Sequence, residues 1–243
     1  MPVNQRFDAL DTLRGIAIVW MAVFHFCYDL NYFGWTRQNF LTDAVWTWQR
    51  TAIVSLFLFC AGLGQAVAVQ QGQTWPRFWR RWGQVALCAL LVTAGSMWMF
   101  PQSYIYFGVL HGIAVMLVVV RLTAGWGCWL WGLGALAIAM KFIAAYAHGE
   151  STGLGFLNEK AFHWLGLISQ KPRTEDYVPI LPWLGVMWWG MAAGTWLLQQ
   201  PKGMPHAPSH AGLSFLGRWS LSFYMLHQPV LLGVLSLASL LRT

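Results

Sequence analysis

An ionisable pair lies in the middle of an apolar stretch near the start of the chain. His25 and Asp29 occur within LRGIAIVWMAVFHFCYDLNYF (residues 13–33), which is otherwise largely apolar. On a helix, residues four positions apart lie on the same face. A rise of ~1.5 Å per residue places His25 roughly 16 Å from Arg14, near the middle of a bilayer. Ionisable groups at that depth are costly, so they usually line a protein interior or a cavity and indicate a functional site.

This pair has the residue types of acid–base catalysis. An imidazole can act as a general base because its pKa lies near working pH. A carboxylate one helical turn away can fix the imidazole tautomer and stabilise its protonated form. The sequence therefore predicts His25 as a general base and Asp29 as its supporting carboxylate. No serine or cysteine elbow accompanies the pair, which favours direct transfer of a group over a covalent enzyme intermediate.

The last apolar segment follows a similar plan. Arg218 precedes His227 by nine residues, and Arg14 precedes His25 by eleven. If the two segments are neighbours, the histidines lie at similar depth and the arginines form a basic rim that can hold a phosphorylated cofactor. We therefore assign Asp11, Arg14 and Arg218 to cofactor binding. Further polar residues in the apolar segments are assigned to the substrate site or its cavity, namely Tyr28, Arg50, His111, Tyr224 and His227.

The composition is that of a membrane protein. Of the 243 residues, 57% are hydrophobic and only 9% are charged, whereas soluble domains carry about 25% charged residues. The net charge of +7 comes from basic residues that flank apolar segments, as expected for topology signals and contacts with anionic lipid. No basic tract is interleaved with stacking aromatics, so nucleic-acid binding is not expected. The cysteines lack metal-ligand spacing, and His206 and His210 lie in a Pro-rich loop, so no metal is expected.

Seven apolar segments approach the ~20 residues that a helix needs to cross a bilayer. We predict an all-α, polytopic transmembrane bundle that forms a single domain over residues 1–243. The predicted spans are residues 12–33, 46–69, 83–100, 105–121, 126–146, 179–198 and 214–239. Basic residues gather on one side, which we predict to be cytoplasmic and to hold the N-terminus; they are Arg6, Arg14, Arg77, Arg80, Arg81, Arg121, Lys202 and Arg218. The first span lacks a cleavage site and is expected to remain as an anchor.

Four stretches of the chain together resemble one known family. They are RFDALDTLRGIAIVWMAVFHFCYDLNYFG (6–34), FGVLHGIAVMLV (107–118), DYVPILPWLGV (176–186) and GRWSLSFYMLHQPVLL (217–232). In this order they resemble the bacterial membrane proteins related to heparan-alpha-glucosaminide N-acetyltransferase. The wider transmembrane acyltransferase group shares an Arg-Gly entry and a histidine in the first of these helices.

The resemblance implies an integral membrane enzyme that moves an acyl group, expected to be acetyl, from cytoplasmic acyl-CoA to a glycan or similar cell-envelope acceptor. It implies a location in the inner (plasma) membrane, a cofactor role for Arg14 and the base role for His25. Asp176 and Trp183, in the third stretch, are assigned to the substrate site or its cavity. The animal lysosomal enzyme carries its catalytic histidine in the loop after the first helix, whereas NYFGWTRQNF here has none. The chain is short, so it would lack part of the acceptor site or complete it as a homo-oligomer.

Two other functions use the same residues. In a transporter or proton-coupled carrier, His25, Asp29, His111 and His227 would relay protons across the membrane. In a non-catalytic membrane partner, these side chains would only form hydrogen bonds between helices, and the arginines would be topology signals. An acyltransferase requires instead that Arg14 and Arg218 line a cytoplasmic entry that reaches His25.

Overall fold

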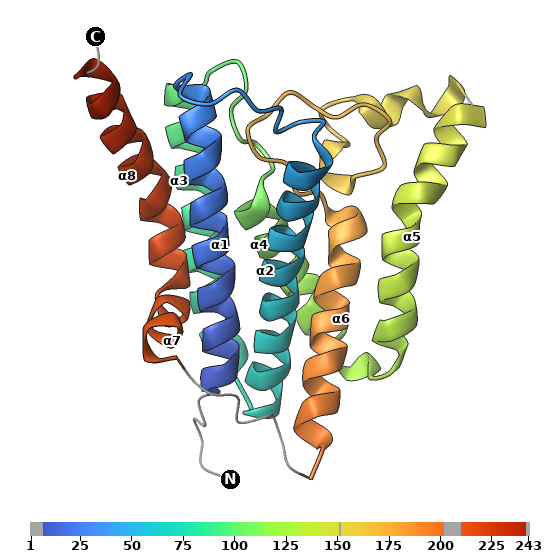
Figure 1. The fold of residues 1–243 in the computed structure, drawn as a ribbon. Helices are drawn as coiled ribbons and strands as arrows, with labels where there is room; N and C mark the ends of the chain where they lie inside the picture. Colours follow the sequence, from blue (N-terminus) through green and yellow to red (C-terminus); the bar gives the residue numbers. More distant parts are fainter. Residues whose placement is uncertain (1–6, 151, 202–209, 242–243) are drawn as a thin grey trace. The chain divides into compact units, whose positions relative to one another are not determined.

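The computed structural model describes residues 7–150, 152–201 and 210–241. Arg6, Lys202 and His206, which entered the topology and metal predictions, lie outside the described residues. The predicted all-α fold is confirmed: helices form almost all of the regular structure in these ranges, and Phe107 and Tyr177 form an isolated β-bridge. Figure 1 labels the helices α1 (Asp8–Tyr32), α2 (Ala44–Gln70), α3 (Trp75–Met99), α4 (Val109–Leu122), α5 (Trp129–Glu150), α6 (Ile180–Gln199), α7 (Ala211–Arg218) and α8 (Ser220–Leu240).

The helices have the lengths and composition of a multi-pass membrane protein. Each of the seven predicted spans coincides with a helix, and α1, α2, α3, α5 and α8 are long and apolar enough to cross a bilayer. The fourth predicted span is shorter than expected, because α4 has 14 residues and begins only at Val109. The seventh predicted span, residues 214–239, is divided between a short helix, α7, which ends at Arg218, and α8, which begins at Ser220. These findings confirm a polytopic helical membrane protein.

The start of α3 differs from the prediction for a local reason. The helix begins at Trp75 and not near residue 83, with Thr74 in an extended conformation before it and a proline in its first turn. Proline is favoured in the first turn of a helix. Backbone N–H groups there have no partner within the helix, so the lack of an N–H costs nothing. Arg77, Arg80 and Arg81 therefore lie on the helix and not in the preceding loop. Long basic side chains at a helix end can extend toward the membrane surface.

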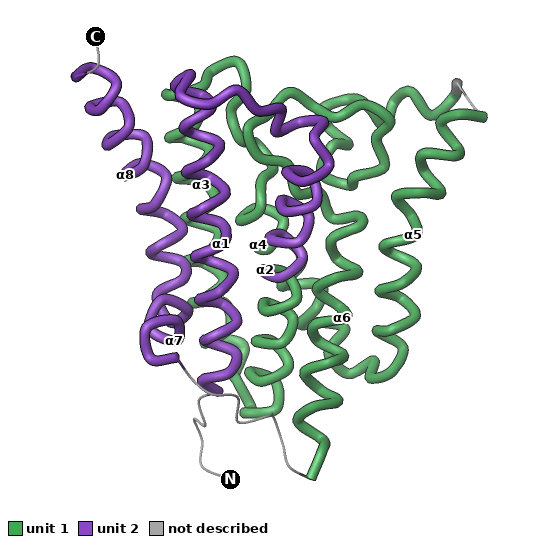
Figure 2. Tube along the Cα trace, in the orientation of Figure 1, with its two compact units in different colours: residues 1–4, 58–204 green, residues 5–57, 205–243 purple. Residues whose placement is uncertain are grey.

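The chain divides into two compact units, coloured separately in Figure 2. One unit contains residues 58–204 with residues 1–4, and the other contains residues 5–57 and 205–243. The second unit joins the beginning of the chain to its end, and it holds most of the predicted site. The prediction of a single domain over residues 1–243 stays a prediction.

The second unit consists of α1, the first half of α2, α7 and α8, with α1 packed against both α7 and α8. Its apolar core contains Ile18, Met21 and Phe24 of α1 together with Phe40 and Ile53. Cys27 and six partly buried aromatic residues pack against this cluster; the aromatic residues are Trp20, Tyr28, Trp46, Phe57, Phe223 and Tyr224. The core therefore lies directly beside the segment of α1 that carries His25.

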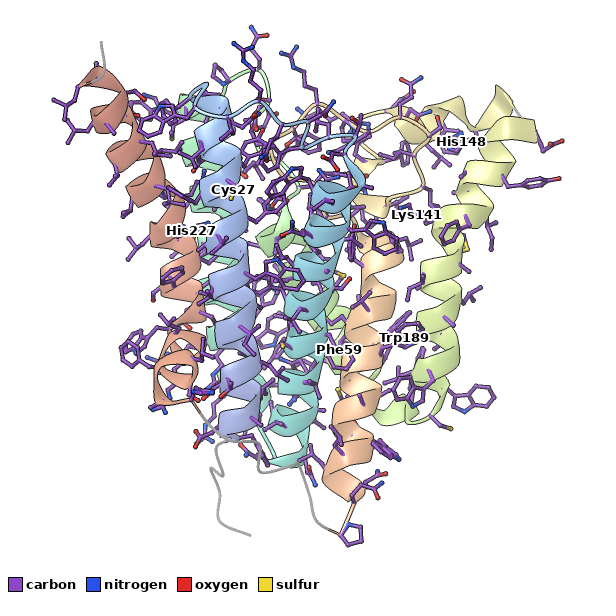
Figure 3. All side chains as sticks on the ribbon, viewed as in Figure 1. Cys27, Phe59, Lys141, His148, Trp189 and His227 are labelled. Atoms are coloured by element: carbon purple, nitrogen blue, oxygen red, sulfur yellow. The ribbon has the colours of Figure 1, made fainter. Side chains whose placement is uncertain are left out.

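The first unit contains α3 to α6 and the segments between them. Glycines allow α5 and α6 to pack closely, since a side chain at Gly185 would overlap the backbone oxygen of Gly134. Trp189 of α6, labelled in Figure 3, donates from Nε1 to the backbone oxygen of Trp131 at 3.0 Å. Small residues at helix contacts are typical of membrane proteins, because they let backbones approach.

Candidate functional site

An ionic cluster occupies one end of the second unit, where α1 begins and α7 ends. Arg14 Nη1 lies 3.4 Å from Asp11 Oδ1, and Arg218 Nε lies 3.9 Å from Asp11 Oδ2. Arg218 Nη2 also lies 4.0 Å from Asp8 Oδ1. The Asp11 side chain is 8% exposed, whereas those of Arg14 and Arg218 are 31% and 39% exposed. We call these four residues the ionic rim; the predicted cofactor residues Asp11, Arg14 and Arg218 do come together in it.

A close contact between α1 and α7 holds the rim together. The hydroxyl groups of Thr12 and Ser214 are hydrogen-bonded at 2.8 Å, and both residues are buried. Gly217 lies against the backbone oxygen of Asp11, and a side chain there would overlap it. Asp8 and Asp11 occupy the first turn of α1, where the helix dipole favours negative charge. The backbone contact therefore places Arg218 beside two carboxylates that the helix end itself stabilises.

Two imidazole rings meet further along α1, where it packs against α8. The ring centroids of His25 on α1 and His227 on α8 are 5.1 Å apart, and the ring planes are 87° to each other, an edge-to-face arrangement. His227 is buried, and Figure 3 labels it on α8; His25 is half-buried. His227 Nδ1 lies 2.7 Å from the backbone oxygen of Tyr224, one turn earlier. The prediction that these histidines lie at similar depth agrees with this contact.

Asp29 is held by α8 and not by the histidine on its own helix. Gln228 Nε2 donates to both carboxylate oxygens of Asp29, at 2.9 and 3.1 Å, and Asp29 is 2% exposed. In the described ranges, no hydrogen bond or ion pair joins His25 to Asp29. The amide of Gln228 also interacts with the His25 imidazole. Gln228, to which the sequence analysis assigned no role, thus interacts with both Asp29 and His25.

The other candidates of this unit surround the imidazole pair at different distances. The Tyr224 ring lies 5.7 Å from that of His227, and the Tyr28 ring packs against Phe40 at 5.3 Å. Arg50 is half-buried on α2 and shares a helix face with Trp46 and Ile53, both of which pack in the apolar core. Tyr224 is therefore part of the immediate surroundings of His227, whereas Tyr28 and Arg50 belong to the wall of the core.

The candidates of the first unit have hydrogen bonds that fix the start of α4. His111 Nδ1 accepts from the Gly108 backbone N–H at 3.3 Å, and its Nε2 lies 3.0 Å from Thr93 Oγ1. Asp176 Oδ2 accepts from the Val109 N–H at 2.7 Å. Both ring nitrogens of His111 are thus engaged, and both side chains bind backbone N–H groups that the helix end leaves without internal partners. This geometry favours a helix-capping role for His111 and Asp176, while Trp183 is half-buried in the first turn of α6.

Comparison with known proteins identifies the family. The family described as heparan-alpha-glucosaminide N-acetyltransferase, catalytic, matches residues 6–229. The chain belongs to this family. Every candidate residue from Asp11 to His227 lies within the matched range. The match indicates a membrane acetyltransferase, in agreement with the apolar helices. No curated protein and no solved structure matches the chain.

The acetyltransferase-family domain contains a second polar cluster that the sequence did not indicate. In the first unit, Tyr106 OH lies 2.5 Å from His163 Nδ1, and Tyr177 OH donates to the His163 backbone oxygen at 2.6 Å. His163 Nε2 lies 2.8 Å from the Asn158 backbone oxygen, and Lys160 contacts the ring of Tyr104. Burial raises the pKa of both Tyr106 and Tyr177, so these phenols stay protonated donors at neutral pH. The cluster joins the segment before α4 to the segment before α6.

The described residues of this family member contain no group of three or more His, Cys, Asp or Glu side chains that could hold a metal ion. The second unit instead holds two partly exposed arginines and two imidazoles. The N-terminal segment supplies one of each, and the C-terminal segment supplies the others. Guanidinium groups suit phosphate binding, and imidazoles suit proton transfer. This combination supplies both parts that acyl transfer from a phosphorylated thioester needs.

Proposed function

We propose that this protein is an integral membrane acyltransferase that moves an acetyl group from cytoplasmic acetyl-CoA to a glycan or similar acceptor in the cell envelope, with His25 as general base. The observation that carries the proposal is the edge-to-face contact of His25 and His227, 5.1 Å between ring centroids, in the same unit as the ionic rim. Family membership supports the acetyl group, and the rim supports a donor with phosphate groups.

The ionic rim fits the phosphates of CoA in its charge and exposure. Asp11 is buried and orients both guanidinium groups, while Arg14 and Arg218 remain about one-third exposed. Each guanidinium has five N–H donors, of which the carboxylates use only part. The outward N–H groups of Arg14 and Arg218 can therefore bind phosphate oxygens without breaking their contacts to Asp11.

In this reaction, the acceptor hydroxyl or amine attacks the acetyl carbonyl carbon while a ring nitrogen of His25 takes its proton. The C–S bond breaks, and the sulfur of CoA leaves with the electron pair and is then protonated. The glycan acceptor is proposed because the description of the matching family names a glucosaminide. The location in the inner membrane is part of the same proposal. The proton-carrier alternative would also use His25 and His227, but the acetyltransferase family match supports the enzyme over the carrier.

The first test is binding of acetyl-CoA to the purified protein in detergent, measured by calorimetry. Arg14→Ala should weaken acetyl-CoA binding by about tenfold or more, since a hydrogen bond to a charged group contributes roughly 1.5–3 kcal/mol. Arg37→Ala is the matched control, because Arg37 is exposed between α1 and α2 and is remote in sequence from the rim. Equal affinities for wild type and Arg14→Ala would remove the rim from the site, and no binding by wild type would contradict the proposed donor.

A further inference from the structure

The hydrogen bonds of His227 fix which of its ring nitrogens carries the proton. His227 Nδ1 lies 2.7 Å from the backbone oxygen of Tyr224. A carbonyl oxygen can only accept, so Nδ1 must carry the N–H. In the neutral ring the lone pair is then on Nε2, by the same logic that orients the histidine of a catalytic triad. The backbone of α8 therefore fixes the tautomer of His227, which is one of the two roles of the carboxylate in a triad.

The Nε2 atom of His227 is a buried acceptor that nothing in the described part of the chain engages. The side chain is 9% exposed, and Nε2 is buried without a hydrogen-bond partner. Buried polar atoms are nearly always hydrogen-bonded, so one that is not needs a specific explanation. Helix packing alone does not supply it, because an apolar ring of similar size would fill the same space without leaving an unpaired acceptor.

Three rings of the described residues contact the His227 ring, and that of His25 is the nearest. The Phe223 ring stacks on His227 at 6.2 Å with a 6° interplanar angle, and the Tyr224 ring packs at 5.7 Å. His25 presents the edge-to-face contact at 5.1 Å. His25 is half-buried and His227 is buried. Gln228, whose amide interacts with His25, can orient that ring.

We propose that His227 is a proton-relay residue, which receives at Nε2 the proton that His25 releases when it takes one from the acceptor. This inference rests on the proposed function. One ring nitrogen of His25 gains the acceptor proton, and its other nitrogen gives its own proton to Nε2 of His227. His227 becomes an imidazolium whose Nδ1–H still donates to the Tyr224 carbonyl, which stabilises the positive charge.

The relay leaves atoms and charges balanced. The new bond joins the acceptor oxygen or nitrogen to the acetyl carbon, and the electron pair of the broken C–S bond leaves on sulfur. The proton held on His227 returns through His25 to the thiolate, which gives free CoA thiol and restores both neutral rings. His25 thus carries no net positive charge while the thiolate leaves.

The tautomer of His227 can be measured without any substrate. In wild-type protein labelled with 15N-histidine and reconstituted in lipid, solid-state NMR distinguishes protonated from unprotonated ring nitrogens. His227→Gln identifies the His227 signals by their loss. We expect a protonated Nδ1 and an unprotonated Nε2 at neutral pH. A protonated Nε2 with an unprotonated Nδ1 would overturn the relay, whatever the enzyme assays show.

Chemical rescue tests the role of the lone pair in turnover. The assay measures transfer from acetyl-CoA to D-glucosamine, used as the probe acceptor, together with acetyl-CoA affinity. His227→Ala should lower kcat by at least about tenfold, within the ~10²–10⁴-fold that acid–base catalysis contributes, and change the acetyl-CoA Kd by less than about twofold. Added imidazole should restore part of the rate, and pyrrole, which fills the same space without a basic in-plane lone pair, should not. Ser222→Ala, exposed on the same helix, is the matched control.

The outcomes separate the relay from the proposed function. Wild-type turnover with an unaffected His227→Ala variant would overturn the relay and leave the acyltransferase intact. Equal rescue by imidazole and pyrrole would assign His227 to packing and overturn the relay as well. If wild type neither binds acetyl-CoA nor acetylates any acceptor in a panel of amino sugars, the proposed function fails and the relay fails with it.

Discussion

Gln228 on α8 holds the buried carboxylate of Asp29 on α1 with hydrogen bonds to both oxygens, at 2.9 and 3.1 Å. This contact lies one helical turn beyond His25 and joins the same pair of helices as the imidazole contact. The carboxylate therefore fixes the relative rotation of α1 and α8 near the imidazoles. In the proposed acyltransferase, this contact keeps His25 and His227 in register.

Loss of the Gln228 amide should destabilise the protein. Gln228→Leu leaves the 2%-exposed carboxylate of Asp29 without its donor, which costs roughly 1–3 kcal/mol for a buried group and more for a charged one. We expect a lower thermal unfolding midpoint in detergent, measured by intrinsic tryptophan fluorescence, with Ser222→Ala unchanged. The double variant Asp29→Leu/Gln228→Leu should recover part of the loss. Strictly additive effects of the two substitutions would contradict the direct contact.

Gly217 should be intolerant of any side chain. A methyl group there overlaps the backbone oxygen of Asp11, whereas one at Gly212 in the same helix meets nothing within 4 Å. Gly→Ala inside a helix normally stabilises by roughly 0.5–1 kcal/mol, but overpacking costs about 1–3 kcal/mol. Gly217→Ala should therefore lower the unfolding midpoint while Gly212→Ala maintains or raises it. A stabilised Gly217→Ala variant would show that α1 and α7 are not in close contact.

The half-buried phenols of the first unit predict a loss of stability at alkaline pH. The ordinary pKa of Tyr177 is 10.0, and burial raises it in the folded protein. The unfolded chain therefore loses this proton at a lower pH than the folded chain, so the free energy of unfolding falls as pH rises above about 10. Tyr177→Phe should show a shallower fall between pH 9.5 and pH 11 in thermal-shift measurements. Parallel curves for the two proteins would contradict the half-buried, protonated phenol.

The fold was predictable to the extent that it depends on local sequence. Long apolar segments located the helices, since a bilayer-spanning helix needs ~20 apolar residues. The start of α4 was not predictable in this way. Asp176, from a distant segment, accepts a hydrogen bond from the Val109 N–H, and His111, on α4 itself, accepts one from the Gly108 N–H. His111 was therefore predicted inside a span that begins at residue 105, whereas it lies in the first turn of a helix that begins at Val109.

The site was predictable in its residue types and less so in its pairings. Arg14, Arg218 and Asp11 do converge, and His25 does meet His227. The pairing of Asp29 with Gln228 depends on the rotation of α8 about its axis, which periodicity along one chain segment does not fix. The position of Gln228, a polar residue directly after His227 in an apolar segment, was the one sequence feature that could have pointed to it. The Tyr106–His163 contact, 57 positions apart, gave no local pattern at all.

The orientation of the protein in the membrane is a separate prediction. The basic residues place the segment between α2 and α3 in the cytoplasm and the long segment between α5 and α6 outside. Reporter fusions near residue 72 should therefore show cytoplasmic activity, and fusions near residue 160 should show the opposite side. The same side for both sites would contradict the seven-span arrangement.

The most direct test of the account is acetyl transfer by wild type and His25→Ala, reconstituted in lipid vesicles with radiolabelled acetyl-CoA and amino-sugar acceptors. Wild type should yield acetylated product. His25→Ala should lose at least about a hundredfold in rate while its affinity for acetyl-CoA changes by less than about twofold, because the base acts on the acceptor and the rim binds the donor. Full activity in His25→Ala, or binding and activity lost together in a folded variant, would contradict the role of His25 as the base.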